Sequence, residues 1–311
     1  MTGSQRGIAL VMVLWVVMLL SIIAGTYVMV ARTEVLQARY LFDTTRARHY
    51  AEAGLNRAVF ELRNPDTETR WYVDGRPYEI EIDQTEVTIR IVDESGKVDI
   101  NVADEEMLQS LFIAAGVEEL QALELSHAII DWRDADDDRM LHGAEIDDYR
   151  AADYPYDPKN APFDTVEELQ LVFGMSYEIY QRVEPAITVY TGRASVNPSV
   201  APELVLAAMP DIDPEMLEQI LRAREEGIDD LDAMIEGLPM GGGRGSSTVY
   251  TIAVEAKLDN GVRDNIRATV RLQGGRPGER AFSILRWQQG VTAAEEGFKP
   301  LTGPDESLDS R

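Results

Sequence analysis

The sequence predicts an α+β fold. A long N-terminal helix, transmembrane and then amphipathic, packs on an antiparallel sheet, and a large all-helical domain is inserted between the strands. Residues 8–31 are uncharged and mostly apolar, and helical spacing of apolar residues continues beyond them. Segments that alternate apolar and polar residues occur both before and after a central region. That central region, residues 99–240, has helical periodicity.

The first element is a membrane-spanning helix over residues 8–31. At about 1.5 Å per residue it is roughly 36 Å long, enough to cross a hydrocarbon core of about 30 Å with some tilt. A secretory signal peptide has a shorter apolar run, about 7–15 residues, before a cleavage site of small residues. Because residues 8–31 exceed that length and no such site follows them, the segment is predicted to remain as an anchor.

The amphipathic half of the same helix covers residues 32–64. Leu41, Ala51 and Leu62 are among the apolar residues that recur at intervals of three and four, with polar residues between them. Asn64-Pro65 is expected to end the helix, because proline lacks the amide donor and its ring clashes with the preceding turn.

The sheet is predicted in two parts, and the helical domain separates them. The first part, residues 65–98, contains expected strands at 69–73, 78–83 and 86–92, with a turn at Asp74-Gly75. The second part, residues 241–288, contains expected strands at 248–258, 265–273 and 281–288, with Asn260-Gly261 as a hairpin signal. Glycine-rich residues 237–247 are expected to form a flexible linker, and residues 289–311 a disordered acidic tail.

The net charge of the chain indicates which kinds of partner it can bind. The chain has 29 Lys and Arg against 55 Asp and Glu, a formal charge of −26 at pH 7, and no cysteine. Such a surface repels nucleic-acid phosphates, so no nucleic-acid partner is expected, and it favours cations and basic partners. Arg6 and the starting amine are expected to hold the short end in the cytoplasm, which puts the large domain outside the inner membrane.

An acidic stretch in the helical domain has the spacing of a calcium loop. Asp134, Asp136 and Asp138 alternate, and Glu145 stands at the twelfth place counted from Asp134. Calcium binds six to eight oxygens, which alternating carboxylates can supply. Arg139 occupies the sixth place, where an EF-hand loop has glycine, so a calcium loop of another kind is predicted. The candidate ligands are Asp131, Asp134, Asp136, Asp138, Glu145 and Asp148.

Two other interpretations of this stretch stay open. It can be a solvated acidic run that ends a helix, with Asp131 as the last polar residue of that helix. It can also be a magnesium-dependent enzyme centre. Asp153, Tyr154 and Asp157, in a proline-rich loop, offer a second set of ligands, although proline turns explain them almost as well.

The helical domain contains a weak internal repeat. Ile100-Asn101-Val102-Ala103 before one apolar helix parallels Val196-Asn197-Pro198-Ser199 before another. In both units the asparagine is expected to cap the helix that follows. The units resemble helix-hairpin-helix modules, but acidic residues flank them, so they are interpreted as scaffold and not as a DNA-binding surface.

The N-terminus resembles that of type IV pilin-like proteins. Arg6-Gly7 directly before the apolar run is similar to the prepilin peptidase site of that superfamily. The resemblance implies cleavage after Gly7 and N-methylation of Ile8. Most members carry a glutamate at the fifth residue after the cut, whereas this chain has Met12. A carboxylate at membrane depth needs a partner, so its absence suggests a subunit that lacks the usual neighbour.

The rest of the chain resembles the K-type minor pseudopilins of type II secretion systems. That resemblance covers residues 6–288 and includes the lack of the glutamate. The matching motifs, in chain order, are Asp99-Ile100-Asn101-Val102-Ala103, the acidic stretch from Asp131 to Tyr149, Phe163-Asp164-Thr165-Val166-Glu167-Glu168-Leu169 and Val196-Asn197-Pro198.

The resemblance implies a non-enzymatic structural subunit. It implies a calcium-containing tip complex with other minor pseudopilins, contact with prepilin peptidase, with the inner-membrane secretion platform and with membrane lipid, and a periplasmic C-terminal domain that enters the pseudopilus. A subunit with so large an insertion is expected at the fibre tip, where nothing stacks above it.

The alternative from another class is a membrane-anchored metal-dependent hydrolase that uses Asp134, Asp136 and Glu145. It requires an open metal position and a general base, and the sequence does not supply that base. The three histidines, His49, His127 and His142, are scattered along the chain, so a histidine metal site is not expected.

Overall fold

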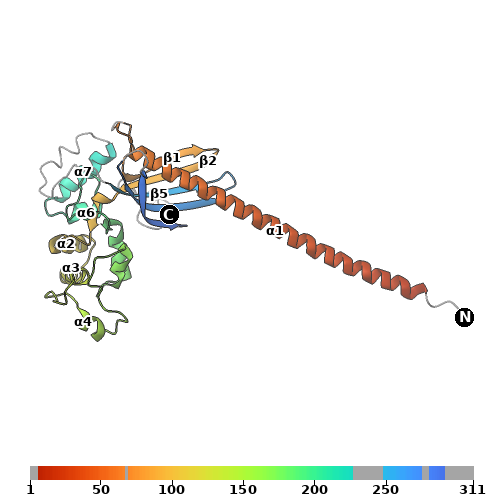
Figure 1. Ribbon diagram of the computed structural model, residues 1–311, viewed down its shortest axis with the longest axis horizontal. Helices are drawn as coiled ribbons and strands as arrows, with labels where there is room; N and C mark the ends of the chain where they lie inside the picture. The colour runs from red at the N-terminus through yellow and green to blue at the C-terminus, as the bar shows by residue number, and fades with distance from the viewer. Residues whose placement is uncertain (1–5, 67–68, 227–247, 275–279, 291–311) are drawn as a thin grey trace, which may run out of the picture.

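The computed structural model describes residues 6–66, 69–226, 248–274 and 280–290. Helix α1 (Arg6–Leu62) packs by its C-terminal part on a five-stranded antiparallel sheet, and its N-terminal part projects away from the rest of the molecule (Figure 1). A mostly helical domain is inserted between two strands of the sheet. The predicted α+β fold class is therefore confirmed, whereas the predicted linker and nearly all of the predicted tail lie outside the described residues.

Helix α1 changes character along its length. Its N-terminal half is long and apolar enough to cross a membrane, and it is not buried within the protein. From Ala47 onward one side is buried against the sheet, as at Ala51 and Leu55. A Cβ on Gly54 would stand 2.7 Å from Val254 Cγ1, so small residues let this part of the helix approach the strands closely.

The sheet, which with α1 forms the head, has the strand order β1-β2-β5-β6-β7. Its strands are β1 (Asp74–Ile82), β2 (Thr85–Asp93), β5 (Val249–Lys257), β6 (Arg263–Leu272) and β7 (Phe282–Gln289). The face that packs on α1 is apolar, with Ile89, Ile252 and Ala268 on the three central strands. The hairpin predicted at Asn260-Gly261 is confirmed, and Gly261 has a φ of 82°, which suits glycine.

Two predictions about the first part of the sheet are wrong. Residues 69–73 form no strand, and Asp74 begins β1 instead of a turn. Gly75, with a φ of 87°, lies where the register between β1 and β2 shifts, so it belongs to a bulge. The chain turns at Asp83 and Gln84, whose φ values of 46° and 67° are those of a two-residue hairpin loop without glycine.

The insertion has its own hydrophobic core, separate from that of the head. Its helices are α2 (Glu105–Ala114), α3 (Glu119–Arg133), α4 (Ile146–Ala151), α5 (Tyr177–Val183), α6 (Glu203–Ala208) and α7 (Pro214–Glu226). Three short 3-10 turns are η1 (Glu94–Gly96), η2 (Val166–Leu171) and η3 (Glu184–Ala186). Strands β3 (Val98–Asp99) and β4 (Ile187–Thr188) form a parallel pair that joins the start of the insertion to its middle.

The expected asparagine caps are wrong. Asp104 caps α2, because its Oδ1 accepts a hydrogen bond from the Met107 amide at 2.9 Å. Asn101 instead exchanges two hydrogen bonds with the backbone of Phe163, at 3.0 and 2.7 Å. Asn197 accepts from the Ser199 amide, several residues before α6 begins. Asn101 thus joins two distant segments, a tertiary role that local sequence cannot reveal, whereas Asn197 stabilises a local turn.

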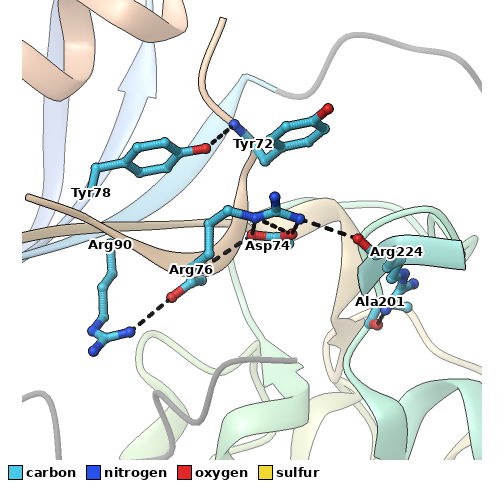
Figure 2. Close-up of polar contacts among 8 residues, drawn as sticks. Tyr72, Asp74, Arg76, Tyr78, Arg90, Ala201 and Arg224 are labelled. Atoms are coloured by element: carbon cyan, nitrogen blue, oxygen red, sulfur yellow. Dashed lines mark hydrogen bonds and ion pairs between the residues drawn. The ribbon is translucent and has the colours of Figure 1, made fainter. Parts of the chain in front are cut away.

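Polar contacts fix the insertion to the head (Figure 2). Arg76 on β1 is held by Asp74, with Nη2 2.6 Å from Oδ2, and it donates to the backbone carbonyl of Arg224 on α7 at 3.4 Å. Arg224 is buried, and its Nη1 donates to the Ala201 carbonyl at 2.7 Å. Burial lowers the pKa of Arg224 to about 10, so the guanidinium remains charged at neutral pH. The hydrogen bond from Arg76 to Arg224 therefore joins the head to the insertion, and the one from Arg224 to Ala201 lies within the insertion.

Candidate metal centre in the acidic loop

The acidic loop connects α3 to α4 and rests on aromatic side chains. Trp132, near the end of α3, is buried, and its ring lies 6.0 Å from that of Phe163 and 6.1 Å from that of Tyr149. Tyr149 is also buried, and its hydroxyl accepts a hydrogen bond from the Phe173 amide at 2.8 Å. Trp132 therefore anchors the loop to the helical core.

Asp131 is the most deeply buried of the candidate ligands. It is fully shielded from solvent, and its two carboxylate oxygens lie 3.2 and 3.3 Å from the Met140 amide, which donates to them. A side chain on Gly143 would collide with Asp131 Oδ2, so only glycine lets the loop pass this close. Burial raises the pKa of Asp131 to about 6, and neighbouring Asp134 adds to the effect.

Asp134 and Glu145 present buried oxygens that lack hydrogen-bond partners among the described residues. These atoms are Oδ1 of Asp134 and both Oε1 and Oε2 of Glu145, a residue that is only 5% exposed. The pKa of Glu145 is raised to about 7, mainly by burial and secondly by repulsion from Asp131 and Asp134. Burial and the charge of Asp136 also raise the pKa of Asp134. Buried, unpartnered carboxylate oxygens are costly unless a cation neutralises them.

The other three candidates are placed differently. Asp136 accepts from the Asp138 amide at 2.9 Å and shapes the loop, and the side chains of both are exposed. Asp148 has both oxygens engaged, one by Arg139 Nη1 at 3.0 Å and the other by the Glu145 amide at 3.1 Å. In this arrangement Asp148 caps α4, because a carboxylate that accepts from a free amide stabilises a helix N-terminus.

Asn160 and Asp137 join the site although the sequence analysis did not select them. Asn160 Nδ2 donates to Asp137 Oδ1 at 2.8 Å and to the Asp136 carbonyl at 3.1 Å. Asn160 Oδ1 is buried without a described partner, like the oxygens of Glu145. The backbone of Asn160 has a positive φ of 47°, a conformation that asparagine tolerates. This is the one local feature that distinguishes the residue.

Two of the three histidines, although far apart along the chain, meet beside the loop. The rings of His127 and His142 lie 5.7 Å apart, and His127 Nδ1 accepts from the His142 amide at 3.1 Å. The other ring nitrogen of His127 lies 3.2 Å from Glu105. Since Nδ1 is already engaged by a backbone amide, this pair supports the loop and does not offer two free metal ligands.

The unpartnered carboxylate and amide oxygens of Asp134, Glu145 and Asn160 suit a hard cation such as calcium better than zinc. Two ring nitrogens near the loop, Nε2 of His127 and Nε1 of Trp132, are also buried without a hydrogen-bond partner among the described residues. Among the described residues, no group of three or more His, Cys, Asp or Glu side chains is already arranged to hold a metal ion. Burial is the main cause of the raised pKa values of Asp131 and Glu145, and repulsion from neighbouring carboxylates adds to it. The loop is therefore chemically suited to calcium, which would draw its oxygens together.

The raised pKa values predict that the calcium-free protein is more stable at mildly acidic pH. Asp131 and Glu145 titrate in the folded state at about 6 and about 7, above their ordinary values of 3.8 and 4.5. Between the ordinary and the raised pKa values, these two carboxyl groups are protonated in the folded protein and ionised in the unfolded chain. The free energy of unfolding therefore falls as pH rises through this range. With chelator present, the unfolding midpoint is expected to be several degrees higher at pH 5.5 than at pH 7.5, measured by circular dichroism.

The control for this pH dependence is Glu145→Gln, which removes one of the two titrating groups. The variant is expected to show a smaller difference between the two pH values. An equal difference in the variant and the unchanged protein would mean that the overall charge of −26, and not this site, causes the trend.

Comparisons with known proteins agree with this architecture. Residues 89–192 match the family model described as type II secretion system protein K. The chain is 29% identical over 276 residues to the type II secretion system protein K of Pseudomonas aeruginosa, covering 81% of this chain and 82% of that protein. It is 28% identical over 252 residues to the Klebsiella pneumoniae protein of the same name, covering 72% and 76%.

A solved structure shares the fold. One chain of the crystal structure of the GspK-GspI-GspJ complex, from the type 2 secretion system of enterotoxigenic Escherichia coli, superposes with a TM-score of 0.56 at 16% identity. The match covers 84% of this chain and 99% of that one, so it includes the head and the insertion. From these sequence and fold matches together, we conclude that the chain belongs to the protein K family of type II secretion systems.

Proposed function

We propose that the chain is a minor pseudopilin, a structural subunit at the tip of the type II secretion pseudopilus, with a part in protein export across the outer membrane. The observation that carries this proposal is the place of the insertion. Its helices lie at the end of the head that points away from the N-terminus of α1 (Figure 1). Pilin-like subunits stack along the fibre, so a large insertion at that end of the head fits a subunit at the tip, above which no further subunit stacks.

Anchoring and processing form the second part of the proposal. The N-terminal half of α1 would hold the chain in the inner membrane by a single span, in contact with lipid, with the C-terminal domain in the periplasm. Prepilin peptidase would cleave after Gly7 and methylate Ile8. Because α1 begins at Arg6, the bond after Gly7 lies in its first turn, so cleavage requires that turn to open. The processed chain would then pass through the inner-membrane secretion platform into the pseudopilus.

The proposed partners are the other minor pseudopilins of the same system. The structural relative comes from a complex of three such proteins, and its alignment with the head and insertion of this chain supports an equivalent assembly. Arg76 on β1 donates a hydrogen bond to the Arg224 carbonyl on α7 at 3.4 Å and so links the insertion to the head. This link favours a defined placement of the insertion against its neighbours.

We also propose that calcium binds the acidic loop as a structural ion. The unpartnered oxygens of Asp134, Glu145 and Asn160 support this proposal, and Asp131, Asp136 and Asp138 are the further candidates. Asp148 would take part only by giving up its contact with Arg139. The ion would join loop segments that otherwise repel one another. The protein is proposed to have no enzymatic activity, in keeping with a structural family.

Co-purification tests the proposed assembly. Full-length chain, co-expressed with the other minor pseudopilins of its system and extracted in detergent, is expected to elute with them as one complex of defined stoichiometry. The major pseudopilin alone serves as the control and is expected to elute separately. If the chain stays monomeric with every minor pseudopilin, the tip-complex proposal is wrong. If the chain forms filaments by itself, it is a major fibre subunit instead.

A further inference from the structure

Arg139 is the single lysine or arginine within the acidic loop. From Asp134 to Asp148 the chain has seven carboxylates, and Arg139 is the one residue of that stretch that always carries a positive charge. An EF-hand loop has glycine at the same place, where its backbone turns sharply. Arg139 does not have a positive φ, so this loop does not require glycine there. The side chain at this place can therefore take another role.

The guanidinium of Arg139 pairs with one of the candidate ligands. Its Nη1 lies 3.0 Å from Oδ1 of Asp148, and Oδ2 of Asp148 accepts a hydrogen bond from the Glu145 amide at 3.1 Å. Glu145 is the residue whose two buried carboxylate oxygens have no described partner. The loop thus has a positive charge of its own, on a carboxylate that is bonded to the backbone of the residue most in need of a cation.

The arginines on either side of the loop are engaged elsewhere. Arg133 donates to two backbone carbonyls at the start of the insertion, at 2.5 and 2.6 Å. Arg150 pairs with Asp157 at 3.0 Å. Within the part of the chain that the structure describes, Arg139 is the one lysine or arginine that forms an ion pair with a candidate calcium ligand.

The pair between Arg139 and Asp148 is open to displacement. The two side chains are 54% and 31% exposed. An ion pair that is this accessible to water is weak, because water solvates both charges and salt screens them. A divalent ion interacts with a carboxylate twice as strongly as a guanidinium does at the same distance. Calcium can therefore displace the guanidinium, which sits on a long and flexible side chain.

We infer that Arg139 is a built-in counter-ion of the acidic loop, which competes with calcium for the Asp148 carboxylate and so lowers the affinity of the loop for the ion. The inference rests on the proposed function, because it concerns the calcium proposed to bind this loop. In the empty loop Arg139 offsets part of the acidic charge. When calcium binds, Asp148 is released to the ion and Arg139 moves into solvent.

Calcium titration of the full chain tests the inference. The detergent-extracted protein is stripped of metal and titrated with calcium chloride in a calorimeter. Arg139→Gln, which keeps the length of the side chain and removes its charge, is expected to lower the Kd about tenfold, equivalent to about 1.4 kcal/mol. The matched control is Arg222→Gln, which changes the net charge equally and removes an exposed pair with Glu218 on α7. It should leave the Kd unchanged.

Thermal unfolding separates competition from a merely structural role. In chelator, Arg139→Gln loses its pair with Asp148 and is expected to unfold about 1–3 °C below the unchanged protein. In saturating calcium the variant is expected to unfold at the same temperature or higher, because the unchanged protein has also given up the pair. An equal loss with and without calcium would mean that Arg139 only supports the loop, and the inference would be wrong.

A double-mutant cycle tests whether Arg139 acts through Asp148. Asp148→Asn removes the charge that Arg139 holds, and asparagine can still accept from the Glu145 amide and cap α4. In this background Arg139→Gln is expected to change the Kd less than about threefold. If the tenfold change persists there, Arg139 acts by repulsion of the ion alone and does not compete for Asp148.

Two further results of the titration bear on the inference. An unchanged or higher Kd in Arg139→Gln overturns it and leaves the proposed calcium site standing. If the unchanged protein and the variant both fail to bind calcium, the proposed calcium site and the inference are both wrong. The proposed place of the chain in the tip complex is decided separately, by co-purification.

Discussion

Removal of calcium is expected to lower the unfolding midpoint of the protein by about 5–10 °C at pH 7.5. A ligand present at a hundred times its Kd stabilises the folded state by about 2.7 kcal/mol, and a domain of about 150–250 residues loses about 2–4 °C per kcal/mol. The physical reason is the set of buried oxygens of Asp134 and Glu145, which have no described partner. Without a cation, those charges remain desolvated and repel one another. Differential scanning calorimetry with and without chelator measures the shift.

A pair of variants locates the ion. Glu145→Gln removes one buried charge and is expected to abolish most of the calcium-dependent shift. Glu106→Gln, an equal change at an exposed position on α2, is expected to retain it. Magnesium at the same concentration should restore little stability, because it demands a tighter octahedral geometry than a flexible oxygen-rich loop provides. If chelation leaves the midpoint unchanged in the unmodified protein, the structural calcium proposal is wrong.

The fold was predictable where each element has its own local pattern. Helix α1 ends at Leu62, just before Asn64-Pro65, because proline stops a helix regardless of its surroundings. Strand β2 follows from the alternation of apolar residues, and β5 from a run rich in apolar and β-branched residues, most of which are buried. The prediction of a turn at Asp74-Gly75 was wrong, and the reason is also physical. An Asp-Gly pair suits both a turn and a bulge, and only pairing with β2 decides between them.

The candidate site was predictable in its residue types but only partly in its geometry. The spacing from Asp134 to Glu145 identified the two residues whose unpartnered oxygens the structure buries. Asp148 has the same residue type, yet the amide of Glu145 and the guanidinium of Arg139 engage it. Asn160 reaches the loop from a distant part of the chain. Such contacts depend on how the whole insertion folds, so spacing along the sequence cannot reveal them.

Gly96 is the position where a single methyl group is expected to do most damage. It ends η1, the first turn after β2, and it is buried where the chain passes from the head into the insertion. A Cβ there would collide with the backbone of Val200, standing 2.6 Å from its carbonyl carbon and 2.8 Å from the Ala201 amide nitrogen. Backbone atoms cannot rotate aside as a side chain can, so one of the two segments must move.

Gly96→Ala is therefore expected to lower the free energy of unfolding by about 2–3 kcal/mol, near the upper end of what overpacking of a core costs. Movement at this point would also loosen the hydrogen bond that the Asn197 amide donates to the Ser95 carbonyl at 2.8 Å. Urea denaturation measures the change, and limited proteolysis should cut the variant faster where head and insertion meet. Gly274→Ala, where a Cβ meets nothing within 4 Å, is the control and should change stability by less than about 0.5 kcal/mol. If both variants unfold at the same urea concentration, the close approach of Gly96 to Val200 does not hold the insertion on the head.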